Sequence, residues 1–126
     1  AIIFFDVDDF KQINDSYGHV QGDVCLAEIA ECIKKVYAND GYCYRIGGDE
    51  FCVLLKNSEK EGMCKQEFLW CMEEKRRKIT FLPTVSYGSA SFSGEDIVEV
   101  KERADRDMYQ YKKGRKKHCS SGVLSK

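Results

Sequence analysis

The sequence predicts an α/β (α+β) sandwich, in which a central and mainly antiparallel sheet is flanked by helices. Three observations predict this fold class. An apolar run over Ile2–Val7 opens the chain. Two further apolar runs within Tyr42–Leu55 flank a Gly-Gly turn, which is typical of a β-hairpin. The segments between and after these strands carry apolar residues at helical spacing.

The segments before the hairpin are expected to form one strand and two helices. Ile2–Val7 suits a strand that is buried on both faces, because its apolar residues follow one another instead of alternating with polar ones. Asp9–Tyr17 is predicted as a short helix that ends at Gly18. Asp23–Tyr37 is predicted as a longer helix, since its apolar residues recur at helical spacing.

The segments after the hairpin predict a helix and a strand. Ser58, followed three residues later by Glu61, resembles a capping box, so we expect it to open a helix that runs to about Lys78. Thr84–Phe92 alternates in the manner of a strand, and we expect a bulge near Gly88.

The last helix is expected over Ile97–Lys112, with an apolar stripe on one side. The stripe consists of Val100, Ala104, Met108 and Tyr111. The resulting order is β-α-α-β-β-α-β-α. Since the chain starts at Ala1 directly in a strand, we expect a single domain that is an N-terminally truncated piece of a longer protein.

Composition limits the broad class of protein. The 126 residues are enough for one domain with its own core, and 43% hydrophobic and 33% charged residues are ordinary for a globular protein. The net charge of -1 gives no reason to expect binding to nucleic acid or to a membrane. We find no bilayer-spanning stretch and no signal peptide, so we expect a cytoplasmic domain, although the full-length protein could be membrane-anchored.

The seven cysteines include no CxxC pair, which favours free thiols over a zinc site. Cys25 and Cys32 are spaced seven residues apart, as are Cys64 and Cys71, so each pair could share one face of a helix. Buried thiols in a reducing cytosol are the expected state.

The hairpin tip Arg45–Phe51 carries two glycines followed by two acids. Gly47 and Gly48 allow positive φ and, having no Cβ, let a large ligand lie against the backbone. Asp49 and Glu50 bring carboxylates to the tip. Glu50 is expected on the other side of the strand from Asp49, and a solvated strand residue is the alternative for it.

A second acidic cluster, Asp6–Asp9, ends the opening apolar run. If the first strand and the hairpin lie side by side, Asp6 and Asp49 come together, and such a carboxylate pair usually implies a cation or a shared proton. Carboxylates and substrate oxygens suit Mg²⁺, so this pair suggests metal-assisted nucleotide chemistry. The alternative is that Asp6 caps the following helix and Asp49 merely occupies a turn.

Polar groups near the first two helices suggest sites for a phosphate and a base. Asp8–Lys11 starts a helix, whose free N–H groups form an anion site; compensation of the helix dipole by the acids is the alternative. Asn14 and Asp23 together could read guanine, since a carboxylate accepts hydrogen bonds from its N–H groups. An exposed Asn14 and an N-capping Asp23 are the alternative.

Four ordered blocks resemble the GGDEF family, the diguanylate cyclases, and together they cover nearly the whole chain. The hairpin block is similar to the signature that gives the family its name, and it is intact. The blocks are Asp6–Asp15 with Gly18-His19 and Gly22-Asp23, then Arg45–Phe51, Val85–Gly88 and Ala104–Lys112.

The resemblance implies a fold like the palm of nucleotide cyclases and polymerases, and condensation of two GTP into cyclic di-GMP with release of pyrophosphate. Asp6, Asp49 and the Val7 carbonyl would ligate Mg²⁺, with Mn²⁺ as a possible substitute. Glu50 would act with Asp49 as a catalytic residue near the reacting ribose. The resemblance also implies GTP-binding groups. Asn14 and Asp23 would bind guanine. The main-chain N–H groups of Asp9, Phe10 and Lys11, helped by the Lys11 side chain, would bind the phosphates, and the remaining GTP-binding residues are Gly47 and Gly48 at the hairpin tip and Lys112 with Arg115.

The resemblance also implies partners. Each domain would bind one GTP, so bond formation needs two domains face to face in a two-fold homodimer. In this family an attached sensory domain usually drives dimerisation, and we expect one in the full-length chain.

The sequence departs from the family pattern in three places. An Arg-x-x-Asp motif of the inhibitory product site aligns with Ala38 and Gly41, so that site is expected to be missing. In the last helix Lys112 is followed by Arg115 at three residues and Lys116 at four, where the family has an arginine at four. The family's leading helix and its L-T-x-L-x-N-R-R segment are absent from this sequence.

Two alternatives stay open. One is a catalytically silent, GTP-binding regulatory module, although silent members usually lose an acid or a glycine of the signature. The other is a cyclase that uses ATP beside GTP, against which Asp23 argues, because a carboxylate would repel the lone pair at N1 of adenine.

Overall fold

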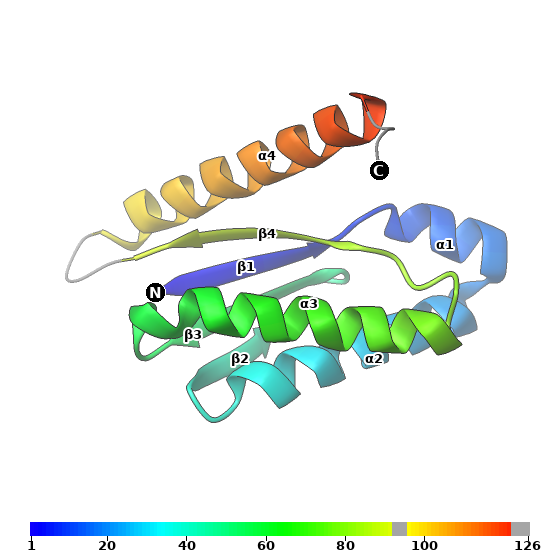
Figure 1. The fold of residues 1–126 in the computed structure, drawn as a ribbon, viewed down its shortest axis with the longest axis horizontal. Coiled ribbons are helices and arrows are strands. Elements are labelled where there is room, and N and C mark those ends of the chain that lie inside the picture. The colour runs from blue at the N-terminus through cyan, green and yellow to red at the C-terminus, as the bar shows by residue number, and fades with distance from the viewer. Residues whose placement is uncertain (92–95, 122–126) are drawn as a thin grey trace.

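Four strands form one antiparallel sheet in the order β2-β3-β1-β4 (Figure 1). The structure is a computed structural model that describes residues 1–91 and 96–121, without the side chains of 97 and 115–121. The strands are β1 (Ile2–Val7), β2 (Gly41–Arg45), β3 (Glu50–Leu55) and β4 (Val85–Ala90). The predicted antiparallel α/β sandwich is confirmed.

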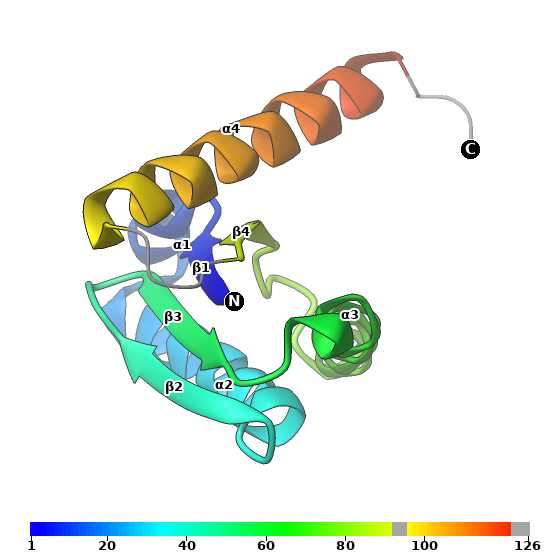
Figure 2. The same ribbon diagram turned by 90° about the vertical axis from the view of Figure 1, so that its left-hand side faces the viewer.

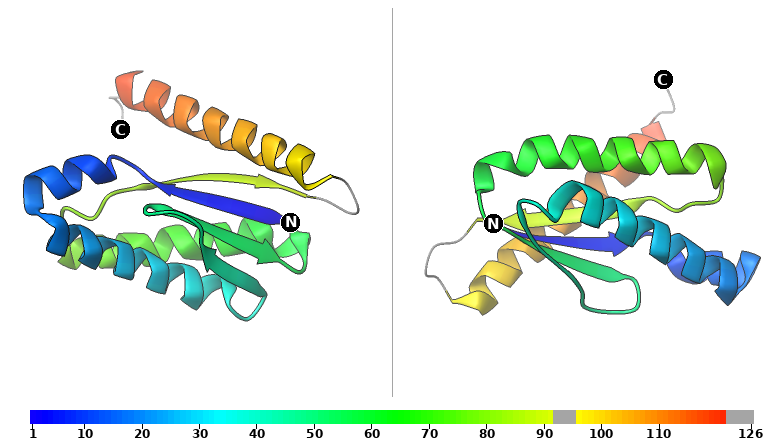
Figure 3. Two further views of the ribbon diagram at one scale, coloured as in Figure 1. Left: turned by 180° about the vertical axis from the view of Figure 1, so that it is seen from behind. Right: turned by 90° about the horizontal axis from the view of Figure 1, so that it is seen from below.

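The helices lie on both sides of this sheet. Figure 2 shows α4 on one side and α2 with α3 on the other, and Figure 3 shows α1 beyond the end of β1. The helices are α1 (Phe10–Tyr17), α2 (His19–Tyr37), α3 (Glu61–Lys78) and α4 (Ile97–Ser121), and a 3₁₀ turn, η1 (Ser58–Lys60), precedes α3. The predicted order of elements is therefore confirmed, and α4 runs beyond the expected end at Lys112.

Alternation along the strands divides the core into two parts. Ile3 and Phe5 of β1 belong to the larger cluster beneath α2 and α3, whereas Ile2 and Phe4 belong to the smaller one beneath α4. The predicted apolar stripe of α4 is confirmed, because Val100 and Ala104 are fully buried in the smaller cluster and Met108 packs against it, while Tyr111 packs against the larger one. In the larger cluster the ring of Phe5 lies 5.1 Å from Phe68, 5.3 Å from Tyr87 and 5.6 Å from Tyr37.

Helix α2 begins at His19, four residues before the predicted start at Asp23. Gly18 has φ 90° and ends α1, with its N–H donating to the Asn14 carbonyl at 2.8 Å, and α2 follows at once. A glycine tolerates this left-handed conformation, so one residue separates the two helices. Asp23 therefore lies inside α2, and its reading as an N-cap is wrong.

Two local predictions are wrong. The side chain of Asn57, and not that of Ser58, accepts a backbone N–H, from Glu59 at 3.0 Å, so the cap opens η1 and α3 starts only at Glu61. Strand β4 has no bulge at Gly88, because its register with β1 is unbroken and pairs Gly88 with Phe4. Phe92, the predicted end of this strand, lies outside the described residues.

Close packing of α4 explains Gly88 instead. A Cβ at this position would overlap the Ala104 carbonyl oxygen and would lie 2.6 Å from the Met108 Cβ. The glycine lets α4 approach the sheet, which is a packing role and not a conformational one.

The cysteines whose side chains are described carry free thiols, and Cys25, Cys32, Cys52 and Cys64 are buried. This confirms the expectation of buried thiols for those four. Cys43 and Cys71 are only half-buried. Among the described helices, none combines the length and apolar character that a membrane span requires.

Candidate functional site

The end of β1 and the tip of the β2–β3 hairpin lie side by side. β1 pairs with β3 so that Asp6 faces Glu50 across the ladder. One residue on, the Val7 N–H donates to the Asp49 carbonyl at 3.0 Å. The structure thus brings Asp6, Val7, Asp49 and Glu50 to one edge of the sheet, and the predicted side-by-side placement of the first strand and the hairpin is confirmed.

Glu50, and not Asp49, is the direct cross-strand neighbour of Asp6. The two carboxylates line a small cavity of about 40 Å³ between the sheet and α4, together with Met108. Like charges at directly opposed positions repel. From α4, Lys112 offsets this repulsion, because its Nζ donates to the Asp6 carboxylate at 2.7 Å.

The buried thiol of Cys52 adjoins this acidic pair on β3. It belongs to the same small apolar cluster beneath α4 as Phe4. Burial raises the pKa of Cys52 to about 11, so the thiol stays protonated at neutral pH. Cys52 therefore contributes no charge to the site.

Arg45 holds the hairpin tip in place through side-chain hydrogen bonds. Its position in the sequence motif did not predict this role. Its guanidinium donates to the Gly47 carbonyl at 3.1 Å and to the Gly48 carbonyl at 2.7 Å. Neither glycine has a φ in the left-handed region, so the turn does not use the positive φ that a glycine allows. Open space surrounds the Cβ position of Gly48, whereas that of Gly47 would lie 3.2 Å from Glu50 Oε1, so a ligand can approach the backbone at Gly48.

The turn from β1 into α1 leaves the helix N-terminus uncapped. Asp9 is the N-cap residue, with φ 54°, and no side chain caps the helix. Asp6 therefore does not cap α1. Uncapped N–H groups at a helix start favour an anion, so this terminus, which includes Phe10 and the exposed Lys11, is suited to a phosphate.

Asp8 ties this turn to β4. Its carboxylate accepts from the Thr84 hydroxyl at 2.7 Å and from the Ser86 hydroxyl at 2.6 Å, and its N–H donates to the Thr84 carbonyl at 2.9 Å. Ser86 is fully buried. Asp8 thus fixes the path of the β1–α1 turn.

Asn14 lies against α2 beside Asp23. A Cβ at Gly22 would overlap Asn14 Oδ1 and would lie 3.1 Å from its Cγ, so only glycine permits this approach. Oδ1 is buried and has no hydrogen-bond partner among the described residues. Asp23, the next residue, is exposed. The close approach of Asn14 explains Gly22, and spacing along the chain could not predict it, because the contact forms only in three dimensions.

The expected cations are placed in part. Lys112 is exposed on α4 and meets Asp6, and Lys11 is exposed on α1. The expectation for Arg115 falls on a side chain outside the described residues.

The donor atoms suit a hard divalent cation that shares its ligands with a substrate. Within 1–91 and 96–121 no group of three or more His, Cys, Asp or Glu side chains could hold a metal alone. Mg²⁺ does not need such a cage, since it is commonly bound by one or two carboxylates with phosphate oxygens and water. Asp6, Asp49 and the Val7 carbonyl supply only oxygen, which fits Mg²⁺ or Mn²⁺.

A family model described as "Diguanylate cyclase, GGDEF domain" matches residues 1–118. The chain belongs to the GGDEF family. It is 37% identical to diguanylate cyclase A of Treponema denticola, over 89% of this chain and 32% of that protein. It is 33% identical to diguanylate cyclase DgcZ of Escherichia coli, over 94% of this chain and 42% of that protein. The chain thus spans about a third to two fifths of the length of these curated relatives.

Solved structures of the family share the fold. The GGDEF domain of DgcB from Caulobacter crescentus, in complex with c-di-GMP, superposes with a TM-score of 0.77 at 30% identity, covering 90% of this chain and 71% of that one. The active GGEEF domain of a diguanylate cyclase from Vibrio cholerae gives a TM-score of 0.66 at 28% identity, covering 90% and 76%. The palm-like GGDEF fold expected from the sequence is confirmed.

Proposed function

We propose that this GGDEF domain is a magnesium-dependent diguanylate cyclase, which joins two GTP molecules into cyclic di-GMP and releases pyrophosphate. The observation that carries the proposal is the meeting of Asp6, Asp49 and Glu50 at the sheet edge beside the uncapped start of α1. One edge therefore offers oxygen ligands for a cation next to amide donors for phosphates. The names of the curated relatives, which are diguanylate cyclases, support the same reaction.

Asp6, Asp49 and the Val7 carbonyl would hold the cation. Bound Mg²⁺, or Mn²⁺ in its place, would neutralise triphosphate charge and lower the pKa of the attacking 3′-hydroxyl. Glu50, which shares a face of the sheet with Asp6, would border the reacting ribose and complete the acidic centre.

Amides and lysines would hold the triphosphate. The main-chain N–H groups of Asp9, Phe10 and Lys11 stand at the start of α1, where the helix dipole favours an anion. Lys112 neutralises Asp6 in this structure. We expect its ammonium to turn to a phosphate oxygen when the site is loaded, helped by Lys11 and Arg115.

Asn14 and Asp23 would bind the guanine base. The buried Asn14 Oδ1 has no partner among the described residues, and leaving such an atom unpaired costs about 1–3 kcal/mol. An N–H of a bound base would satisfy it. The exposed Asp23 carboxylate would accept from the remaining guanine donors and would disfavour adenine.

Catalysis would need two copies of the domain. Because each site holds one GTP, the two hydroxyl attacks require two sites that face each other about a two-fold axis. We expect an attached sensory domain to control this homodimer, and we expect no role for nucleic acid or for membrane contact by this domain, which we place in the cytoplasm.

A direct assay tests the reaction. The chain is incubated with GTP and Mg²⁺ at high protein concentration, beside an Asp49→Asn control, and products are identified by mass spectrometry. Cyclic di-GMP from the wild type alone supports the proposal. Binding of GTP without any product, in this chain and in its full-length protein, would favour the silent regulatory module; the intact signature argues against that alternative.

Product feedback offers a further prediction. A Cβ at Gly41 would overlap the Leu54 carbonyl oxygen, so this strand position cannot carry the aspartate of the usual inhibitory site without moving the backbone. We expect cyclic di-GMP to inhibit only by competing with GTP. Inhibition kinetics at several GTP concentrations measure this, and tight non-competitive inhibition would contradict it.

A further inference from the structure

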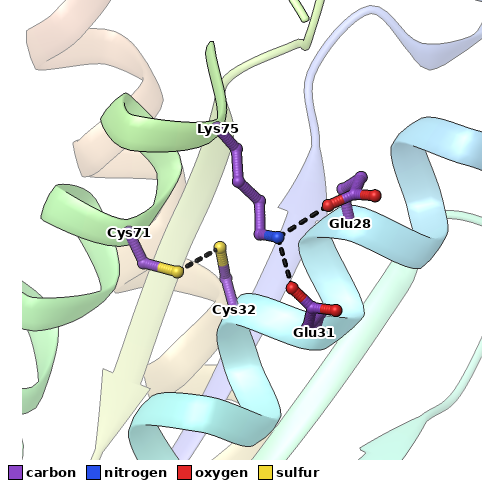
Figure 4. A network of polar contacts seen from close by, with 5 residues as sticks. All are labelled: Glu28, Glu31, Cys32, Cys71 and Lys75. Carbon is purple, nitrogen blue, oxygen red and sulfur yellow. Dashed lines mark hydrogen bonds and ion pairs between the residues drawn. The ribbon is translucent and has the colours of Figure 1, made fainter. Parts of the chain in front are cut away.

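Two thiols meet between α2 and α3, on the side of the sheet away from the acidic edge. The Cys32 thiol donates to the Cys71 sulfur with the two Sγ atoms 2.7 Å apart (Figure 4). A disulfide bond is about 2.05 Å long, so the sulfurs need to approach by less than an ångström to be joined.

The two thiols differ in access. Cys32 is 0% exposed, whereas Cys71 is half-buried. Cys71 also lines two surface hollows along the α2–α3 seam, of about 660 and 490 Å³. A small oxidant can therefore reach Cys71 before it reaches Cys32, which is buried next to Cys71.

An ion-pair network holds the helices in register at this point. Lys75 lies one helical turn after Cys71, and its Nζ meets Glu28 at 2.6 Å and Glu31 at 2.5 Å (Figure 4). The Lys75 side chain is only 17% exposed, which strengthens these contacts relative to a fully solvated pair. The network joins the two helices beside the sulfur contact.

We propose that Cys32 and Cys71 form a reversible thiol-oxidation site, which a peroxide converts into a disulfide between α2 and α3. The Cys71 thiolate attacks one oxygen of hydrogen peroxide and the O–O bond breaks, so Cys71 becomes a sulfenic acid and the other oxygen leaves as hydroxide, which takes up the proton lost by the Cys71 thiol and becomes water. The Cys32 sulfur then attacks the Cys71 sulfur, and the hydroxyl leaves with the Cys32 proton as water. In sum, two thiols and one peroxide give one disulfide and two waters, and a thiol reductant reverses the bond.

The crosslink would close a loop that contains the whole β2–β3 hairpin. The two cysteines are 39 positions apart, and the hairpin of residues 41–55 lies between them. Closing a loop of this length restricts the unfolded chain, so oxidation should raise the midpoint of thermal unfolding by about 10 °C.

Peptide mapping tests the proposal without nucleotide, so its outcome does not depend on the proposed enzyme activity. The purified chain is treated with hydrogen peroxide, the remaining thiols are alkylated, and a double digest after acidic and basic residues places Cys32 and Cys71 on separate peptides. We expect a linked peptide pair of these cysteines, a mass loss of about 2 Da, the rise in unfolding temperature, and reversal by dithiothreitol.

Cys71→Ser and Cys32→Ser should abolish the linked pair and the thermal shift. Cys43→Ser is the matched control, because Cys43 is also half-buried, and it should keep both. Separate oxidation of the two cysteines, sulfinic acid on Cys71 with Cys32 still free, or an unchanged unfolding midpoint would each overturn the proposal.

Discussion

The two faces of the sheet differ in what they bury. Towards α2 and α3, the strands and the helices share a large apolar cluster that includes Phe5 of β1, Phe68 of α3 and Tyr37 of α2. Towards α4, the apolar cluster is smaller, and the same strands end in Asp6 and Glu50 with Lys112 above them. Because neighbouring residues of a strand point to opposite faces, one strand can serve stability on one side and chemistry on the other.

This comparison predicts that substitutions on the two faces have separable effects. On the acidic edge they should change activity with little change in stability, and beneath α2 and α3 they should do the reverse.

Asp49→Asn should give the largest effect. It removes one expected ligand of the cation, so cyclic di-GMP formation should fall at least about 1000-fold, or about 4 kcal/mol of transition-state stabilisation. Stability should change little, because Asp49 supports the fold through its carbonyl, which asparagine retains. Turnover is measured by mass spectrometry and stability by urea unfolding. Glu99→Gln, at the start of α4, is the control, and its rate of cyclic di-GMP formation should stay within twofold of the wild type. A similar loss of rate in Glu99→Gln, or full activity in Asp49→Asn, would contradict the prediction that the acidic edge carries the activity.

Phe68→Ala tests the opposite face. Phe68 is 1% exposed and its ring packs on Phe5, so truncation should cost about 3–5 kcal/mol in the free energy of unfolding. Trp70, two residues along the same helix, is 76% exposed. Trp70→Ala should therefore change the free energy of unfolding by at most about 0.5 kcal/mol. Denaturant unfolding of both variants provides the measurement, and equal losses would show that the core does not lie where the structure has it.

Gly88→Ala probes the contact of α4 with the sheet. The new methyl group would meet the Ala104 carbonyl and Met108, so we expect a loss of about 1–3 kcal/mol in the free energy of unfolding. Gly62→Ala is the matched helical control: nothing lies within 4 Å of its Cβ position, and it should gain up to about 1 kcal/mol. If Gly88→Ala left the free energy of unfolding unchanged, α4 would be able to shift away from the sheet at no cost, which would contradict the close contact.

Lys112→Gln should have the smallest effect on stability. The Lys112–Asp6 pair is partly exposed, so its loss should cost less than about 1 kcal/mol. If Lys112 turns to phosphate in the loaded site, GTP binding should weaken about tenfold, which calorimetry can measure. Lys113→Gln, its exposed neighbour, should bind GTP normally; identical behaviour of the two variants would contradict a specific role for Lys112.

Much of the fold could be predicted because periodicity is a local signal. The predicted strand Ile2–Val7 matches β1, the predicted hairpin Tyr42–Leu55 covers β3 and all of β2 except Gly41, and α4 starts at Ile97 as predicted. The errors lie where a local rule met a competing contact. The side chain of Asn57 forms the capping hydrogen bond that was expected from Ser58. Gly88 allows α4 to pack closely on the sheet and does not form the expected bulge.

The candidate site could be located from sequence only in outline. The motifs indicated that Asp6 and the hairpin acids belong together, and β1–β3 pairing brings them to one edge. The assigned roles of these residues stay predictions. The brace at Arg45 and the close approach of Asn14 to Gly22 were not predicted, because each depends on distances between segments that no spacing encodes.

The sequence by itself determined the order of elements, the antiparallel hairpin and the family, since these follow from periodicity, turn residues and ordered motifs. Only the tertiary structure decided that Glu50 opposes Asp6, that Lys112 forms an ion pair with Asp6, and that Cys32 contacts Cys71. The physical reason is that strand register and helix packing are set by the sum of many long-range contacts, and a pattern along the chain does not contain that sum.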